Sequence, residues 1–181
     1  MVRNRIDRIK VSKLRIVHYP EPVLLEVARP VEVFDDSLKT LVSDMFETMY
    51  DAEGVGLAAP QIGVSKRIFV MDCTHSPDGE RKFALINPEI VMQEGEQYGG
   101  EGCLSFPGIY SDVRRNLRAV VRFQDADGKQ QELDVTELEA RCVLHENDHL
   151  DGIVFLDRMS ALKREIAKRK INKLRKTGEW D

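Results

Sequence analysis

The chain has 181 residues, of which 42% are hydrophobic and 32% are charged, and its formal net charge is −4. These proportions indicate one globular domain over residues 1–181 with a real core, and they exclude a disordered chain. No apolar run approaches the roughly eighteen residues that cross a bilayer, so we expect no membrane partner.

The N-terminal segment and the cysteines bear on location. Residues 1–20 are rich in charge and lack the apolar centre of a secretory signal. An Arg-rich start also occurs in organelle transit peptides, but this one runs into a strand-like segment, Leu14 to His18, and lacks their serine richness. Three cysteines without framework spacing indicate free thiols in a reducing compartment. We therefore expect a cytoplasmic protein, with an organellar location as the weaker alternative.

One helix and four strands are predicted in chain order before residue 136. Apolar residues at three- and four-residue spacings predict a helix from Ser37 to Tyr50, with Ser37 as its cap. Segments rich in Val, Ile and Phe, separated by turn signals such as Ser76 to Gly79 and Asp125 to Gly128, predict antiparallel strands. These strands are Arg67 to Asp72, Phe83 to Met92, Leu117 to Gln124 and Gln131 to Val135.

Two more helices are predicted in the C-terminal part of the chain. The first runs from Thr136 to Leu150, capped by Thr136 with Glu139 three residues on, and ends near Gly152. The second, residues 159–176, has a dense basic face and an apolar side. That apolar side consists of Met159, Leu162, Ile166, Ile171 and Leu174. The expected fold class is α+β, with antiparallel strands grouped around the central helix.

The predicted central helix carries the sequence His145-Glu146-Asn147-Asp148-His149. Residues four apart share one face of a helix, so His145 and His149 can bind one metal ion from adjacent turns. Glu146 lies one step round the helix, where it can take a proton from a water on that ion. This arrangement is typical of a hydrolase.

A metal hydrolase needs a third protein ligand and one open position for water. The zinc-protease pattern HExxHxxGxxH fits as far as Gly152, but Phe155 stands where its third histidine belongs. Glu165 and Glu179 follow the motif, yet both lie in the basic tail. Cys103, between a glycine and a turn in Glu101-Gly102-Cys103-Leu104-Ser105, is our candidate for the third ligand. Cys73 and Cys142 fit better as small buried hydrophobic residues, with Cys142 expected to form a pocket wall.

Three motifs together resemble those of the peptide deformylase family, of the bacterial and organellar, iron-dependent type. They are GVGLAAPQ at 54–61, EGCLS at 101–105 and HENDHLDG at 145–152, and the likeness extends from about Val17 to Arg158. The resemblance implies a metallohydrolase that removes the formyl group from the N-terminal formyl-methionine of new polypeptides. Nascent formyl-methionyl polypeptides are then the expected substrate.

The resemblance also implies roles for particular residues. Cys103, His145 and His149 would hold one divalent metal ion, Fe²⁺ by family habit, with Zn²⁺, Ni²⁺ or Co²⁺ able to substitute. Glu146 would act as general base and acid. The Gln61 side chain and the Leu104 backbone N–H would stabilise the negative charge of the intermediate, a contribution of about 3–4 kcal/mol. By itself, Gln61 would be read as a surface loop residue.

The substrate positions follow from the same motifs. GVGLAAPQ lacks the features of a P-loop or a dinucleotide fingerprint, so we expect no nucleotide cofactor. Its small residues can instead let a peptide backbone come close, and the resemblance implies that the bound peptide pairs with this stretch as an added strand. Arg141 could cover the methionine pocket with its aliphatic stem while its head reaches solvent, or it could be a solvated helix charge. The expected substrate-binding residues are Val55, Gly56, Glu101, Gly102, Leu138, Arg141 and Cys142.

Two questions stay open at this point. Glu101 and Asp148 could orient a metal ligand or pair with Arg114, Arg115 or Arg118. The tail of residues 158–181 holds nine Lys/Arg against three acids, so its helix could contact the ribosome through RNA phosphates or be a solvated face. The rival functions are a zinc metalloprotease, against which Phe155 argues, and a non-enzymatic RNA-binding module, which rests on the tail alone.

Overall fold

The computed structural model describes residues 13–74 and 81–180, and the fold is α+β, as predicted. Its described strands form a five-stranded sheet in the order β1-β2-β3-β6-β7 and a two-stranded sheet, β4-β5, with every pairing antiparallel. The first sheet consists of β1 (Gly56–Ala58), β2 (Ile68–Asp72), β3 (Lys82–Glu94), β6 (Arg118–Gln124) and β7 (Gln130–Thr136), and the second of β4 (Gln97–Gly102) and β5 (Tyr110–Arg115).

Four of these strands were predicted and three were not. β2, β3, β6 and β7 confirm the apolar segments, whose β-branched residues fit a pleated, half-buried surface. β4 and β5 were missed because glycine, polar and charged residues dominate them, and β1 was missed because it has only three residues. The strand-like segment Leu14 to His18 is not a strand, although the Val17 N–H donates to the Gln61 carbonyl at 2.8 Å. The expected turn at Ser76 to Gly79 lies outside the described residues.

Helix α1 (Asp36–Asp51) confirms the first helix prediction, but its cap differs. The Asp35 carboxylate, not Ser37, accepts the Leu38 N–H at 3.0 Å, and Ser37 lies inside the first turn and donates to Asp35. Asp and Ser are both good N-cap residues, but Asp35 has the extended backbone that an N-cap residue requires. The apolar face of α1 packs on β2 and on the strand residue Leu57.

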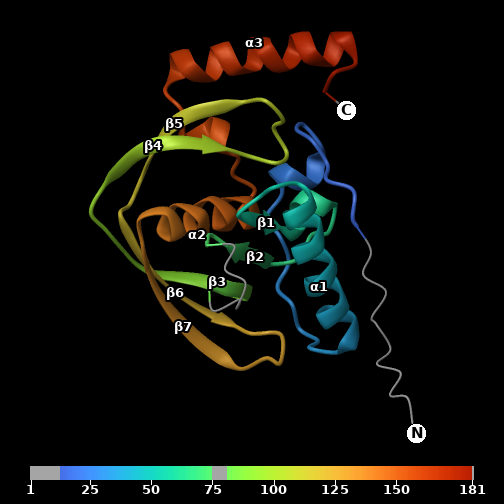
Figure 1. Cartoon of the computed structure of the whole chain (residues 1–181), viewed down its shortest axis with the longest axis vertical. Coiled ribbons are helices and arrows are strands. Elements are labelled where there is room, and N and C mark those ends of the chain that lie inside the picture. The colour runs from blue at the N-terminus through green and yellow to red at the C-terminus, as the bar shows by residue number, and fades with distance from the viewer. Residues whose placement is uncertain (1–12, 75–80, 181) are drawn as a thin grey trace, which may run out of the picture.

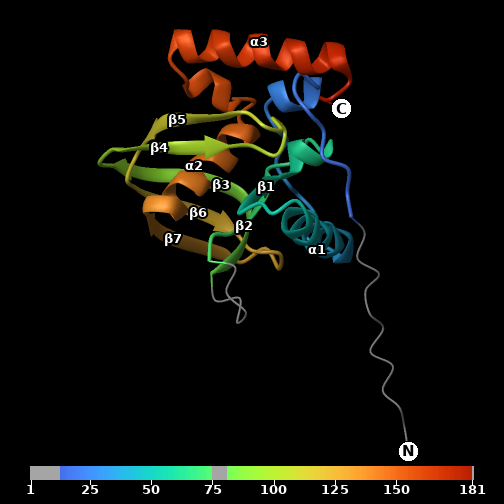
Figure 2. The ribbon, with the colours of Figure 1, turned by 45° about the horizontal axis from the view of Figure 1, so that its top comes forward.

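Helix α2 (Glu137–Leu150) lies across the concave side of the five-stranded sheet, as Figures 1 and 2 show. Ala140, Val143 and Leu144 bury its apolar face against that sheet. Thr136 precedes the helix as predicted, but its side chain makes no capping hydrogen bond, and Glu139 pairs with Arg81 instead. The helix ends at Leu150, near Gly152 as predicted, and the φ of +69° at Gly152 favours a residue without a Cβ atom.

Helix α3 (Ala161–Thr177) begins at its cap Ser160 and lies beside the two-stranded sheet (Figures 1 and 2). The predicted apolar side is partly wrong, because Leu162 is 72% exposed and Ile166 is 58% exposed. The helix covers a narrow two-stranded sheet, so only Ala167 and Ile171 are buried on it. After the helix, Trp180 is buried in a core cluster that the sequence did not signal.

Three short 3₁₀ helices complete the fold: η1 (Pro22–Leu25), η2 (Ala59–Ile62) and η3 (Phe155–Arg158). η2 directly follows β1 and presents Gln61 towards α2, whereas η3 connects α2 to α3. In the described residues, no helix is long and apolar enough to cross a membrane. Helix α2, which carries the two motif histidines, lies between the edge strand β1 and the two-stranded sheet.

Candidate metal centre

Helix α2 places both motif histidines on the face that looks towards the two-stranded sheet. Their ring centroids lie 5.1 Å apart, and both side chains are buried. Two imidazoles and a glutamate on one helix would be costly to bury without partners. The structure supplies partners for the two imidazoles from other elements, beginning with a thiol.

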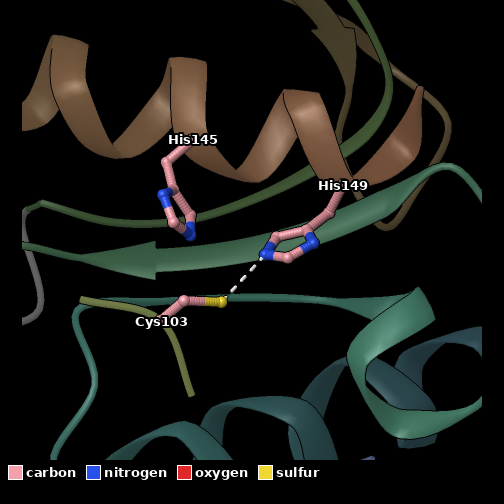
Figure 3. A group of neighbouring side chains, drawn as sticks. All are labelled: Cys103, His145 and His149. Atoms are coloured by element: carbon pink, nitrogen blue, oxygen red, sulfur yellow. Dashed lines mark hydrogen bonds between the residues drawn. The ribbon is translucent and has the colours of Figure 1, made fainter. Parts of the chain in front are cut away.

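Cys103 follows β4 and approaches the two histidines from across the cleft (Figure 3). Its Sγ atom lies 3.3 Å from His149 Nε2. One ligand atom from each of Cys103, His145 and His149 lies within 4.8 Å of the other two. The structure thus brings together the three side chains that the sequence suggested as ligands.

The surroundings of these three residues fit a divalent cation. His145 Nδ1 is bonded to Glu101 Oε2 at 2.9 Å, which leaves its other ring nitrogen for the cluster. Burial by itself would lower the pKa of His145, but hydrogen bonds with Cys103 and Glu101 raise it well above its ordinary value. Burial lowers the pKa of His149, so that this imidazole is neutral. Imidazole nitrogen and cysteine sulfur are the donor atoms that zinc and the later first-row metals accept.

Glu146 lies beside the cluster and against the edge strand β1. A Cβ atom at Gly56 would lie 2.5 Å from Glu146 Oε1, so the carboxylate packs directly on the glycine backbone. Its Oε2 atom is buried and has no hydrogen-bond partner among the described residues. Burial raises the pKa of Glu146 to about 7. A carboxylate of that basicity can take up a proton near neutral pH.

Gln61 is buried, not a surface loop residue, and its amide is oriented by the backbone. Its Oε1 accepts the Ala58 N–H at 2.8 Å. The Nε2 group then points to the cluster, 3.5 Å from Cys103 Sγ and 3.4 Å from Ser105 Oγ. A fixed N–H donor therefore faces the position where a substrate oxygen would lie near the ligands.

A cleft of about 500 Å³ opens above these residues, and all seven of the expected substrate-binding residues line it. Leu138 on its rim is 52% exposed, and Gly102 lies under the Tyr110 ring, where a Cβ atom would be 2.6 Å away. Its lining includes Val55, Gly56, Gln61, Glu101, Gly102, Cys103, Leu104, Leu138, Arg141, Cys142, His145 and Glu146. His149 lies deeper and does not line the cleft.

Cys142 and Arg141 line the cleft in different ways. The Cys142 thiol donates to the Val55 carbonyl, and a hydrogen bond with Cys73, followed by burial, raises its pKa well above the ordinary value. A protonated thiol suits the expected pocket wall. The Arg141 head does not reach solvent, because it is buried and bonded to Glu101 and to the Gly99 carbonyl. The guanidinium joins α2 to the two-stranded sheet. Both predictions for it, a head that reaches solvent and a solvated helix charge, are therefore wrong.

Buried charges behind the cleft settle which arginine pairs with the acids. Arg115 donates to Glu101 at 2.8 Å and to Asp148 at 2.5 Å. Burial alone would raise the pKa of Glu101, but hydrogen bonds from His145 and Arg115 hold it below its ordinary value. Asp148 also accepts hydrogen bonds from Arg158, a contact that was not predicted because Arg158 begins the basic tail. Arg114 and Arg118, the other candidates, pair with acids at the surface.

A thiol and two imidazoles that converge beside a buried carboxylate, under a cleft open to solvent, define a metal-dependent hydrolase. The comparisons give the particular family. Residues 13–165 match the family Polypeptide deformylase, and the chain belongs to this family.

Known proteins similar to this chain agree with that membership. A peptide deformylase of Acidobacterium capsulatum is 52% identical over 165 residues, covering 91% of this chain and 97% of that protein. A crystal structure of a peptide deformylase from Legionella pneumophila superposes with a TM-score of 0.87 at 45% identity, covering 94% of this chain and 99% of that one. A peptide deformylase from Synechococcus elongatus in complex with actinonin gives a TM-score of 0.83 at 39% identity, covering 87% and 86%.

Proposed function

We propose that this chain acts as a single-domain peptide deformylase in which Cys103, His145 and His149 hold the metal ion and Glu146 moves the proton. Family membership makes the chain a hydrolase that removes the formyl group from N-formyl-methionyl polypeptides. The observation that supports the residue assignment is the convergence of the three ligand atoms within 4.8 Å beside Glu146.

The ion that we propose is Fe²⁺, with Zn²⁺, Ni²⁺ or Co²⁺ able to substitute. A thiolate with two imidazoles accepts all four, and the family resemblance favours iron. When bound, the ion lowers the pKa of a coordinated water and polarises the formyl oxygen. The Glu101 carboxylate keeps His145 in the orientation and tautomer that a metal ligand requires.

Glu146 and Gln61 carry the chemistry of the protein itself. Glu146 accepts the proton of the attacking water and returns it to the departing amine, so that formate and a free N-terminus are released. The Gln61 side-chain N–H and the backbone N–H of Leu104 would donate to the formyl oxygen as it becomes negative. The bond from Ala58 N–H to Gln61 Oε1 fixes the amide beforehand, which removes the cost of orienting it during the reaction.

Two strand edges next to the cleft suit an extended peptide. β1 is the edge of the five-stranded sheet, and β4 pairs with β5 alone among the described strands. Val55, Gly56 and Gly102 therefore offer backbone groups to a peptide lying between the two sheets. Leu138, Cys142 and the stem of Arg141 would surround the methionine side chain, with Glu101 behind them.

The test of the assignment is formate release from formyl-Met-Ala-Ser by anaerobically prepared protein, with bound metal measured alongside. Glu146→Gln should lower kcat by about 10²–10⁴-fold while the metal content stays unchanged. Glu137→Gln, an exposed change on the same helix, should leave both unchanged. Formate release by Glu146→Gln at the rate of the unchanged protein would reject the assignment. Cleavage of internal bonds in an unformylated peptide would favour the protease alternative.

The partners and location that we propose are the ribosome and the cytoplasm. Helix α3 carries eight Lys/Arg and one acid, with Lys168, Arg169 and Lys173 exposed, so it could contact RNA phosphates. Deleting the tail would be a poor test, because Trp180 is buried and donates to the Tyr19 carbonyl.

Charge reversal on α3 is the better test of ribosome contact. Changing Lys168, Arg169 and Lys173 to Glu should abolish co-sedimentation with ribosomes at low salt and leave formate release from a free peptide unchanged. A control with the same change in charge at the exposed residues Arg114, Arg122 and Lys129 should still co-sediment. Equal co-sedimentation of both variants would reject docking through α3.

A further inference from the structure

The catalytic cleft and a second hollow share the side chain of Tyr110. The second hollow, which we call the β5–α3 groove, has a volume of about 300 Å³ and lies between β5 and α3. Tyr110 lines both the groove and the 500 Å³ cleft, and it is 80% exposed. The ring lies on Gly102, which immediately precedes Cys103. The cleft and the groove therefore adjoin at Tyr110.

The groove is formed because α3 covers the two-stranded sheet only in part. Lys163 bonds to the Tyr98 hydroxyl at 2.9 Å, and Lys170 donates to the Gly108 carbonyl at 2.7 Å. Between these two attachments the buried Met159 and Ala167 form a floor, and Ile166 remains 58% exposed beside it. Figures 1 and 2 show the helix lying along β5 over this stretch.

The groove combines apolar surface with positive charge. Ile166, Met159 and the Tyr110 ring offer apolar contact, whereas Lys163 and Lys170 lie at the rim. Lys163 is near Asp112, at 3.5 Å, but Lys170 has no carboxylate within ion-pair distance in the part of the chain that is described. The chemistry suits an extended peptide with an apolar side chain followed by an acidic one.

We propose that the β5–α3 groove is a distal substrate subsite, which binds residues of the formyl peptide well beyond its methionine. The inference rests on the proposed deformylase function and adds a second determinant to it. Tyr110 pairs with Gly102 across the β4–β5 ladder, so the groove begins next to the ligand Cys103. An extended chain advances about 3.3–3.6 Å per residue, so the peptide residues that would reach beyond Tyr110 to Ser111 and Asp112 are those after the third.

Peptide length provides the first measurement. For the unchanged protein, kcat/KM for formyl-Met-Ala-Ser-Leu-Asp-Ala should exceed that for formyl-Met-Ala-Ser by about fivefold, since a leucine side chain becomes partly buried. Ile166→Glu should remove this gain and leave the rate on the short peptide unchanged. Leu162→Glu is the matched control, because Leu162 is exposed on the same helix but does not line the groove.

Charge provides the second measurement. Lys170→Glu should reverse the preference between the Leu-Asp peptide and its Leu-Lys counterpart, again without effect on the short peptide. Thermal unfolding of each variant shows whether the fold is kept. Equal kcat/KM for short and long peptides in the wild-type protein would overturn the subsite. Formate release from both peptides would still support the proposed function. No formate from either peptide would overturn both.

Other occupants of the groove give distinct outcomes. If Ile166→Glu lowers ribosome co-sedimentation or self-association and the dependence on peptide length persists, the groove binds another surface and the proposal fails. An equal loss on short and long peptides would indicate a structural role for Ile166 and would likewise overturn it.

Discussion

Glu101 Oε2 lies 2.9 Å from Nδ1 of His145, and both side chains are buried. The ion pair therefore joins a carboxylate at the end of β4 to a candidate metal ligand on α2. Because Arg115 and Arg141 hold the same carboxylate, the orientation of His145 depends on the two-stranded sheet and on the helix together.

Glu101→Gln tests this relationship through metal affinity. The amide keeps the size of the side chain and loses its charge, so metal affinity should fall by about 10–100-fold. Competition with a chelator measures the change. Glu96→Gln is the control, because Glu96 pairs with Arg114 at the surface, and it should bind metal as the unchanged protein does. Equal affinities for both variants would contradict the orienting role.

Gly56→Ala tests the close approach of Glu146 to β1. The new methyl group would lie 2.5 Å from Glu146 Oε1 and 2.8 Å from Cys142 Sγ, so the carboxylate must move. We expect kcat for formate release to fall by about 10- to 100-fold with metal content unchanged. Gly100→Ala, where no atom lies within 4 Å of the new methyl group, should keep most of the activity. Retained activity in Gly56→Ala would show that Glu146 does not need its present position.

Arg115→Met tests the buried charge network by stability. Removing the guanidinium leaves Glu101 and Asp148 with less compensation in a buried setting, at a cost of about 3–5 kcal/mol. Urea unfolding monitored by circular dichroism gives the value. Arg118→Met, which also removes two ion pairs but at the surface, should cost clearly less. Similar losses for the two variants would mean that burial does not strengthen the network.

The raised pKa of Tyr50 should make the folding stability of the protein fall at alkaline pH. Burial and then the hydrogen bond to Asp72 raise the pKa of Tyr50 from 10.0 to about 12. A raised folded pKa gives stability that is complete below pH 10 and lost as the pH rises through 12. A pH titration followed by the absorbance of ionised tyrosine should show a component near pH 12. The Tyr50→Phe variant should lack this component, and the control variant Tyr110→Phe, in which an exposed tyrosine is changed, should keep it. Persistence of that component in Tyr50→Phe would disprove the assignment.

The periodic elements were predictable because their residues carry the pattern of one buried face. The apolar stripe of α1 and the β-branched strands β2, β3, β6 and β7 each report burial locally. β1 is too short, with three residues, to show such a pattern although Leu57 and Ala58 are buried, and β4 and β5 consist mostly of glycine, polar and charged residues. The prediction that Leu162 and Ile166 lie on a buried side of α3 was wrong, because apolar spacing alone does not show which surface the helix packs on.

The α+β class, the helix that carries HENDH and the short list of residues able to bind metal could all be predicted without a structure. Those features depend on spacing along one element, where i and i+4 residues share a helix face. Only the tertiary structure decided that Arg115 and Arg158 pair with the acids, that the Arg141 head is buried and that Tyr110 connects two hollows. Each of those contacts joins elements far apart in the chain. A charged group or an aromatic ring has many possible partners in the sequence, and only the packing of the elements selects one of them.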